Sequence, residues 1–224
     1  MKSIWITGAS SGIGKALAIK FANEGWQVAA SARREDLLNK IAESNKNISS
    51  FPLDVTDGEK CKEIFGQIKN KLQSIDICFF STGTWDPKKE KDIDVDQMKK
   101  VMNVNFFGTL NCIKAVEKYF REKNSGHISI VSSIAGYRGL PNSTGYGASK
   151  AALNNLAESL YFDFGRNNVR VSLISPGFIK TQMTDKNQFK MPFLKTAEYA
   201  ANKIYNGLIN GSSFEIDFPK ELTL

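Results

Sequence analysis

The hydrophobic and polar positions of this chain follow two periodicities in turn. Short runs rich in β-branched and aromatic residues are separated by longer segments whose apolar residues recur at helical spacing. We expect seven strands at Ser3–Thr7, Gln27–Ser31, Ile48–Leu53, Ile75–Phe80, His127–Ser132, Val169–Ser175 and Phe214–Phe218. We expect six helices, roughly Gly12–Asn23, Asp36–Ser44, Gly58–Lys71, Val95–Lys123, Tyr146–Arg166 and Ala197–Leu208. Strands that alternate with helices predict right-handed βαβ units, and therefore a doubly wound, seven-stranded parallel sheet in a three-layer αβα architecture.

The pattern does not divide the chain into parts. Runs such as Ile75–Phe80 are almost entirely apolar, as strands covered by helices on both faces are. Neither a linker, a low-complexity segment nor a solenoid repeat interrupts the 224 residues. We therefore expect one domain spanning residues 1–224.

Composition narrows the partners and the compartment. The net charge of +7 comes from scattered lysines, and the one dense run, Lys88, Lys89 and Lys91, is interrupted by an acid, so we expect no nucleic-acid partner. A basic surface also suits an anionic cofactor. No apolar stretch approaches the roughly 20 residues of a membrane span. The three cysteines are far apart in sequence, which predicts buried thiols, no metal site and a cytoplasmic location.

A glycine-rich turn joins the first strand to the first helix. Residues 7–14 read Thr-Gly-Ala-Ser-Ser-Gly-Ile-Gly. Glycines let the backbone approach a pyrophosphate closely, and the helix N-terminus offers free N–H groups and the positive end of its dipole. A strand precedes the turn and a helix follows, so we favour a dinucleotide cradle over an ordinary tight turn. The cradle residues are Gly8, Ser10, Ser11, Gly12, Ile13 and Gly14.

The end of the second strand indicates which dinucleotide is bound. Sheets that bind NAD usually place an acid there to accept from the ribose 2′-hydroxyl. This chain has Ala32 followed by Arg33 and Arg34, and guanidinium groups suit a 2′-phosphate. We therefore expect NADP(H) to be preferred over NAD(H). The alternative is a pair of surface arginines, which the dipole at a helix start disfavours.

Three polar residues predict proton-transfer chemistry. Tyr146 and Lys150 are four residues apart, on one face of a predicted helix, and Ser133 ends a strand thirteen residues before Tyr146. A free tyrosine has a pKa near 10, about three units too high for an acid/base near neutrality. A neighbouring ammonium supplies roughly the 4 kcal/mol needed to favour the phenolate. Ser133 is placed to hold a substrate oxygen against the tyrosine hydroxyl.

These motifs together closely resemble the short-chain dehydrogenase/reductase family in its single-domain form, over about residues 2–181. The resemblance implies a Rossmann-type fold, a homodimer or homotetramer, and catalysis by Asn105, Ser133, Tyr146 and Lys150. Asn105 would hold a proton-relay water, and Lys150 would also bind the nicotinamide ribose. Cofactor contacts implied beyond the cradle and the arginines come from Asp54, Val55, Gly83, Asn105, Tyr146, Lys150, Pro176, Gly177 and Thr181.

The chain departs from the family pattern after the fourth strand. The family usually has Asn-Asn-Ala-Gly there, whereas this chain has Phe80-Ser81-Thr82-Gly83. The resemblance therefore carries over Gly83 but not the asparagines.

The expected function is hydride transfer between nicotinamide and a carbonyl or secondary alcohol, with Tyr146 as the general acid/base. A short substrate lid is expected at about residues 182–196, and the aromatic and methionine side chains around it favour an apolar substrate: Phe178, Met183, Phe189, Met191 and Phe193. Trp85 either walls the active site or is an aromatic residue of a surface loop. The alternative function is a catalytically silent dinucleotide sensor or scaffold, which the full set of catalytic residues disfavours.

Overall fold

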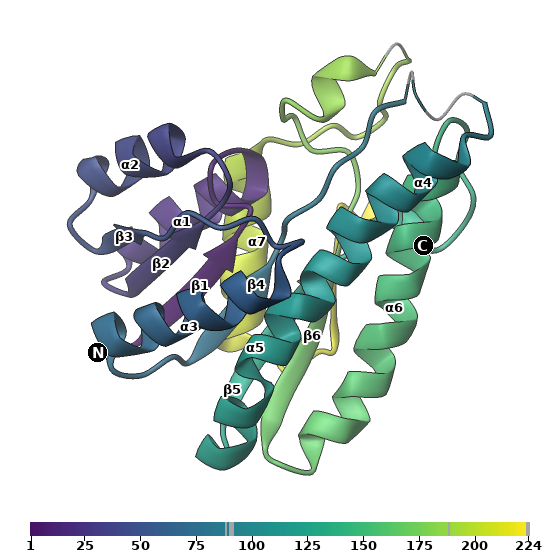
Figure 1. The fold of residues 1–224 in the computed structure, drawn as a ribbon. Helices are drawn as coiled ribbons and strands as arrows, with labels where there is room; N and C mark the ends of the chain where they lie inside the picture. Colours follow the sequence, from purple (N-terminus) through teal and green to yellow (C-terminus); the bar gives the residue numbers. More distant parts are fainter. Residues whose placement is uncertain (88, 90–91, 188, 223–224) are drawn as a thin grey trace.

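The predicted parallel sheet is present. The computed structural model describes residues 1–87, 89, 92–187 and 189–222, so Lys88 and Lys91 of the basic run lie outside the described residues. Seven parallel strands lie in the order β3-β2-β1-β4-β5-β6-β7 (Figure 1). They are β1 Ser3–Thr7, β2 Gln27–Ser31, β3 Ile48–Ser50, β4 Ile77–Phe80, β5 Gly126–Val131, β6 Val169–Pro176 and β7 Glu215–Phe218.

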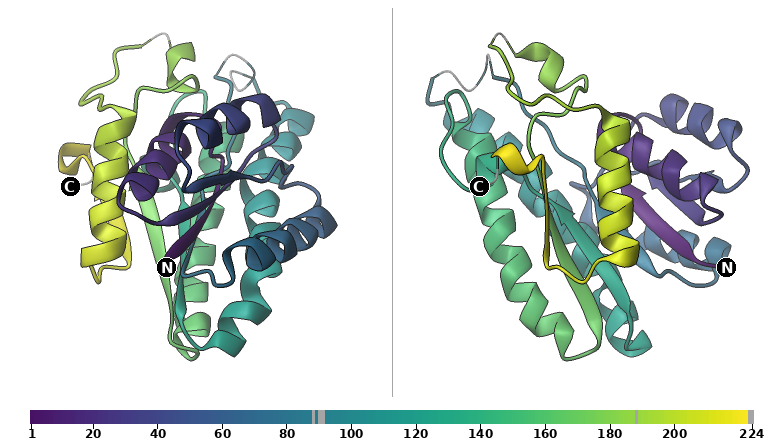
Figure 2. Two further views of the ribbon diagram at one scale, coloured as in Figure 1. Left: turned by 90° about the vertical axis from the view of Figure 1, so that its left-hand side faces the viewer. Right: turned by 180° about the vertical axis from the view of Figure 1, so that it is seen from behind.

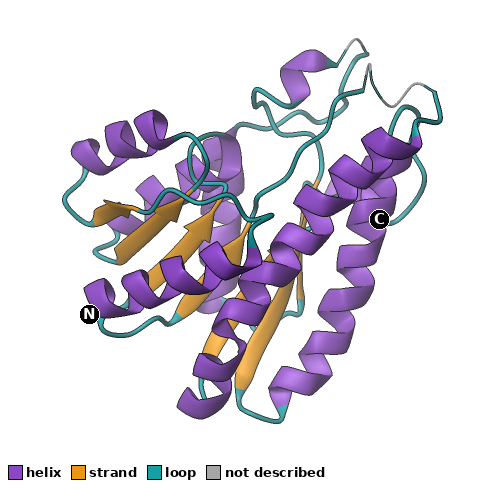
Figure 3. Cartoon of the chain, viewed as in Figure 1, coloured by secondary structure: helices purple, strands orange, loops and turns teal. Residues whose placement is uncertain are grey.

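Helices cover both faces of the sheet (Figure 3). The α-helices are α1 Gly12–Asn23, α2 Glu35–Ser44, α3 Gly58–Leu72, α4 Val95–Met102, α5 Gly108–Lys123, α6 Thr144–Gly165 and α7 Ala197–Asn210. Buried residues of α1, α2 and α7 pack on one face, and those of α3, α5 and α6 on the other. Figure 2 shows α7 beside α1 although the two helices are far apart in sequence. The doubly wound, Rossmann-type architecture is therefore confirmed.

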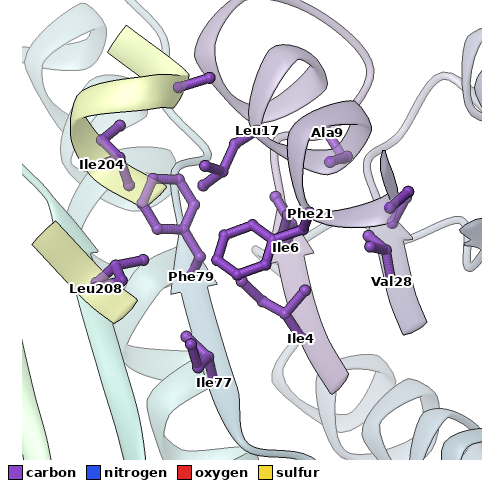
Figure 4. Packing of buried hydrophobic residues seen from close by; sticks show 14 of the residues in the cluster. Ile4, Ile6, Ala9, Leu17, Phe21, Val28, Ile77, Phe79, Ile204 and Leu208 are labelled. Carbon is purple, nitrogen blue, oxygen red and sulfur yellow. The ribbon is translucent and has the colours of Figure 1, made fainter. Parts of the chain in front are cut away.

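Each face of the sheet has its own hydrophobic core. In the first, Phe79 of β4 lies between Leu17 of α1 and Ile204 and Leu208 of α7 (Figure 4). In the second, Trp5 of β1 is fully buried and its ring packs against neighbouring aromatic rings. Burying one such side chain contributes about 1.5–3 kcal/mol. The two cores hold the strand ends, and the turns that follow them, in fixed positions.

The predicted helix over Val95–Lys123 is wrong in one respect, because it is not a single α-helix. A π-helical turn at Asn103–Phe107 separates α4 from α5. Such a turn closes hydrogen bonds one residue wider than an α-helix, and it is common at functional sites. Here it contains Asn105, which is fully buried. Smaller differences concern β3, which ends at Ser50, and β4, which begins at Ile77.

The strand order locates the site. Chain connections leave β1 in one direction toward β2 and return on its other side at β4. Open parallel sheets bind ligands outside the carboxyl ends of the strands at such a switch point. The glycine-rich turn after β1 and the segment after β4 meet there.

The structure also answers whether a helix could span a membrane and what state the cysteines are in. No helix in the described part of the chain is long and apolar enough to cross a membrane. The three cysteines are buried free thiols, as expected. Cys61 and Cys112 are 51 residues apart in sequence, yet their sulfurs are 3.8 Å apart where α3 packs on α5.

Candidate active site

The glycine-rich turn is shaped by contacts that exclude larger side chains. Gly8 has φ +70°, and a Cβ there would lie 2.9 Å from the backbone carbonyl of Ser81. A Cβ on Gly14 would lie 2.5 Å from the carbonyl oxygen of Gly8. Glycine accepts both the positive φ and the close approach. The turn therefore leads the backbone directly into α1, whose first residues line the cleft.

Ser81 ties this turn to the end of β4. Its Oγ donates to the carbonyl of Thr7 at 2.6 Å, and its N–H donates to Thr7 Oγ1 at 3.2 Å. The next residue, Thr82, has a buried Oγ1 with no hydrogen-bond partner among the described residues, and it lines the same cleft. Buried hydroxyls normally have a hydrogen-bond partner, so this oxygen stands out. The departure from the family pattern thus places a serine and a threonine at the cleft, where the family usually has asparagines.

The cleft at the switch point is a cavity of about 290 Å³. Of the predicted residues, those lining it are Gly8, Ser10, Ser11, Gly12, Ile13, Gly14, Arg33, Arg34, Asp54, Val55, Gly83, Ser133, Tyr146, Lys150, Pro176, Gly177 and Thr181. Asn105 does not line the cavity but lies buried beside it. Residues that sequence reasoning did not select as ligands also line it, among them Ser81, Thr82 and Gln182. A signal for the first two existed, namely their place directly after a buried strand at the switch point.

The other edges of the cleft are fixed by local hydrogen bonds. Asp54 Oδ1 accepts from the N–H and hydroxyl of Thr56, at 3.0 and 2.8 Å, which orients the carboxylate at the end of the β3 segment. Gly177 N–H donates to the carbonyl of Phe218 at 2.7 Å. Thr181 N–H donates to Thr184 Oγ1 at 2.9 Å. These contacts position the residues that the family resemblance assigns to adenine and nicotinamide.

Arg34 reaches across the cleft from the start of α2. Its Nη2 donates to Ser10 Oγ at 3.0 Å and to Ser11 Oγ at 2.8 Å, both in the glycine-rich turn. Its Nη1 donates to Gln182 Oε1 at 3.2 Å. Arg33 lines the same cavity, and the preceding side chain is the neutral Ala32. This end of the cavity thus presents two guanidinium groups, with a neutral residue at position 32.

Ser133, Tyr146 and Lys150 converge because β5 and α6 are fastened together. Ser132, which follows β5, donates through Oγ to the carbonyl of Lys150 at 3.1 Å. Ser133 begins the short 3₁₀ turn Ile134–Gly136, where its Oγ accepts from the N–H of Ala135 at 3.2 Å. Tyr146 lies in the first turn of α6, half-buried. All three predicted side chains thus face one cavity.

The Lys150 ammonium is buried beside the Tyr146 ring. The side chain of Lys150 is 4% exposed, its Nζ donates to the carbonyl of Val131 at 2.8 Å, and it lies 5.6 Å from the centre of the Tyr146 ring. Burial lowers the pKa of Lys150 to about 8 from its usual 10.5. The group is still mostly protonated near neutral pH, where it presents a positive charge to the phenol.

Asn105 anchors the loop that follows β4. Its Oδ1 accepts from the N–H of Thr84 at 2.7 Å, and its Nδ2 donates to the carbonyl of Thr84 at 3.1 Å and to Ser149 Oγ at 3.0 Å. The amide side chain is therefore engaged with protein groups on both of its polar atoms.

Comparisons with known proteins agree with this architecture. The family model for short chain dehydrogenase matches residues 2–192. An uncharacterized oxidoreductase of Myxococcus xanthus is 32% identical over 223 residues, which is 98% of this chain and 88% of that protein. A structure of ElxO with NADP bound is 29% identical with a TM-score of 0.83, covering 96% of this chain and 97% of that one. A short-chain dehydrogenase from Streptomyces avermitilis is 22% identical with a TM-score of 0.87, covering 99% of this chain and 90% of that one, and shows the shared fold.

The chain belongs to the short-chain dehydrogenase family, since the model covers most of its length. It is a dinucleotide-dependent oxidoreductase that uses a nicotinamide cofactor and acts on a small molecule. The oxidoreductase relatives favour an enzyme over the silent sensor or scaffold that the sequence left open.

Proposed function

We propose that this protein is an NADPH-dependent carbonyl reductase, working also as a secondary-alcohol dehydrogenase, with Tyr146 as its general acid/base. The observation that carries the proposal is the buried Lys150 ammonium, 5.6 Å from the centre of the Tyr146 ring and in one cavity with Ser133. An ammonium beside a phenol stabilises the phenolate, so the phenol can release its proton near neutral pH.

Each residue has a separate task in this proposal. The bound cofactor supplies or accepts the hydride. Ser133 donates a hydrogen bond to the substrate oxygen and orients it. Tyr146 gives its hydroxyl proton to the oxygen of a carbonyl that is being reduced, and takes the proton back when an alcohol is oxidised. Lys150 keeps the phenolate stable and holds the ribose hydroxyls of the nicotinamide half.

The preference for NADP(H) is supported by the arginines at the start of α2. Arg34 already donates to the serines of the glycine-rich turn, and Arg33 lines the same cavity without an acid at position 32. ElxO, a similar protein, has been solved with NADP bound. A charge-assisted contact between an arginine and a phosphate contributes roughly 1.5–3 kcal/mol, enough to decide between the two cofactors.

The segment 182–196 is the proposed substrate lid, with residue 188 outside the described residues. It includes the 3₁₀ turn Thr184–Lys186, and an isolated β-bridge pairs its Lys195 with Ile179. Its aromatic and methionine side chains support an apolar substrate.

Assembly and compartment complete the proposal. A homodimer or homotetramer is supported by exposed apolar side chains near the α4–α6 pair, with Phe107 50% and Phe162 69% exposed. The buried free cysteines suit the reducing cytoplasm.

One experiment tests the assignment of the acid/base. Wild type and Tyr146→Phe are assayed by NADPH oxidation against a panel of ketones, aldehydes and 3-oxoacyl compounds, and NADPH affinity is measured by fluorescence. Phenylalanine removes the proton donor with little change of volume. Turnover should fall by about 10²- to 10⁴-fold with NADPH affinity retained. Turnover that survives the substitution would show that Tyr146 is not the proton donor.

A further inference from the structure

A tryptophan lies directly against the proposed catalytic tyrosine. Trp85 comes from the loop between β4 and α4, and its ring centre is 5.4 Å from that of Tyr146, with 32° between the two planes. The indole N–H donates to the carbonyl of Asn142 at 3.0 Å. Of the two readings that the sequence left open, the wall of the active site is the one that this packing supports.

The position of the indole is fixed on both sides. The preceding residue, Thr84, is held at its N–H and its carbonyl by the buried amide of Asn105. The hydrogen bond to Asn142 holds the far edge of the ring. Because the polar atom of the indole is already bonded, what Trp85 offers to a substrate is an apolar π surface.

The loop that carries Trp85 is joined to the proposed lid. The Asp86 carboxylate and the Lys186 ammonium are 3.5 Å apart. On the lid side, the rings of Phe178 and Phe189 meet edge to face with centres 5.7 Å apart. Figure 1 shows both segments side by side beyond the carboxyl ends of the strands. Trp85, which packs on Tyr146 at the cavity, therefore lies on a loop that an ion pair links to the aromatic side chains of the proposed lid.

We propose that Trp85 contacts the substrate and selects carbonyl compounds that carry a flat aromatic or conjugated group beside the carbonyl. The proposal rests on the carbonyl-reductase function above. A carbonyl that accepts a hydrogen bond from the Tyr146 hydroxyl lies beside the indole, because the indole packs against the phenol ring. Offset stacking on the indole favours a flat ring over a saturated ring of the same size by about three- to tenfold in affinity.

The test compares acetophenone with cyclohexyl methyl ketone, which have the same carbon skeleton but differ in the aromaticity of the ring. Each ketone is titrated by calorimetry into the protein saturated with NADP⁺, because the oxidised cofactor has no hydride to transfer and binding is measured without turnover. Wild type should bind acetophenone about three- to tenfold more tightly. Trp85→Leu should abolish the difference, whereas Trp85→Phe, which keeps an aromatic face, should retain most of it.

The affinity for NADP⁺ serves as the folding control, since Trp85 is not part of the cofactor cradle. Trp85→Met is a second non-aromatic variant should the leucine variant fail to fold. Equal binding of the two ketones to wild type, binding of neither, or a preference that survives in both non-aromatic variants would overturn the proposal. A separate turnover assay with NADPH distinguishes failure of the reductase function from failure of the stacking proposal. A ketone that binds but is never reduced contradicts the reductase function, while the binding preference attributed to Trp85 still holds.

Discussion

The charge on Lys150 should destabilise the folded protein, and Lys150→Met should therefore stabilise it. Burial lowers the pKa of Lys150 from 10.5 to about 8. At about 1.4 kcal/mol per unit, the folded state loses roughly 3 kcal/mol by keeping this charge near neutral pH. Methionine keeps much of the apolar stem but leaves the carbonyl of Val131 without its donor, which costs about 1 kcal/mol. The expected net gain at pH 7 is about 2 kcal/mol.

The pH dependence of stability shows whether Lys150→Met gains stability by removing a buried charge or by improving the packing. Below pH 8 the lysine is protonated in both states and the full penalty applies. Between pH 8 and 10.5 the unfolded chain binds more protons at this residue than the folded protein does. The stability of wild type should therefore rise relative to the variant across this window, and the advantage of Lys150→Met should shrink.

The measurement is urea unfolding of the cofactor-free protein at pH 7 and about pH 10. The control is Lys118→Met on α5, where the lysine side chain is 86% exposed, and its stability should stay near that of wild type at both pH values. The reasoning fails if Lys150→Met is less stable than wild type at pH 7, or if its gain is the same at both pH values. The Lys150→Met variant should nonetheless lose turnover, because the Lys150 ammonium of the wild type stabilises the Tyr146 phenolate in the proposed mechanism.

Two further predictions concern the cofactor cleft. Wild type should bind NADPH about 10- to 100-fold more tightly than NADH, and Ala32→Asp with Arg33→Leu should reverse the ratio, because a carboxylate repels the 2′-phosphate and accepts from a ribose hydroxyl. Titration of both cofactors checks this, and an unchanged ratio in the double variant would contradict it. Ser81→Ala removes the 2.6 Å hydrogen bond to the Thr7 carbonyl and should lower stability by about 1 kcal/mol while weakening NADPH binding. Urea midpoints and NADPH titration measure both effects, and unchanged values would show that Ser81 does not hold the turn.

The sequence predicts the elements best where two independent signals coincide. The bounds of β1 and α1 agree with the prediction at both ends, because a buried strand, a glycine-rich turn and an amphipathic helix follow one another without a gap. The helix over Val95–Lys123 has a continuous apolar pattern, so nothing in the pattern reveals the π-helical turn at Asn103–Phe107. A π-helical turn differs from an α-helix in the carbonyl to which each N–H donates, and hydrophobic periodicity does not encode this hydrogen-bonding pattern. The difference matters for the proposed site, because the turn carries Asn105, whose amide binds the backbone of Thr84.

The positions of loop residues could not be predicted from the sequence. Ser133, Tyr146 and Lys150 are predictable because each has a fixed place on a strand end or helix. Trp85 lies in a segment without periodicity, and its contact with Tyr146 depends on a carbonyl 57 residues away in sequence. Hydrophobic periodicity does not encode long-range contacts of this kind, which is why the sequence indicates the proposed reaction more clearly than the proposed substrate.

The sequence does not indicate which of the adjacent arginines, Arg33 or Arg34, contacts the glycine-rich turn, and the structure does. The two arginines lie between the end of β2 and the start of α2, and they do not make the same contacts. Arg34 is the one that donates to Ser10 and Ser11, while Arg33 lines the cavity beside it. A phosphate that enters this cleft meets a guanidinium already oriented by the serines of the cradle. In the proposed NADP(H) site Arg34 would still face the phosphate after a change of Arg33, so Arg33→Leu alone should shift the ratio less than Ala32→Asp with Arg33→Leu does.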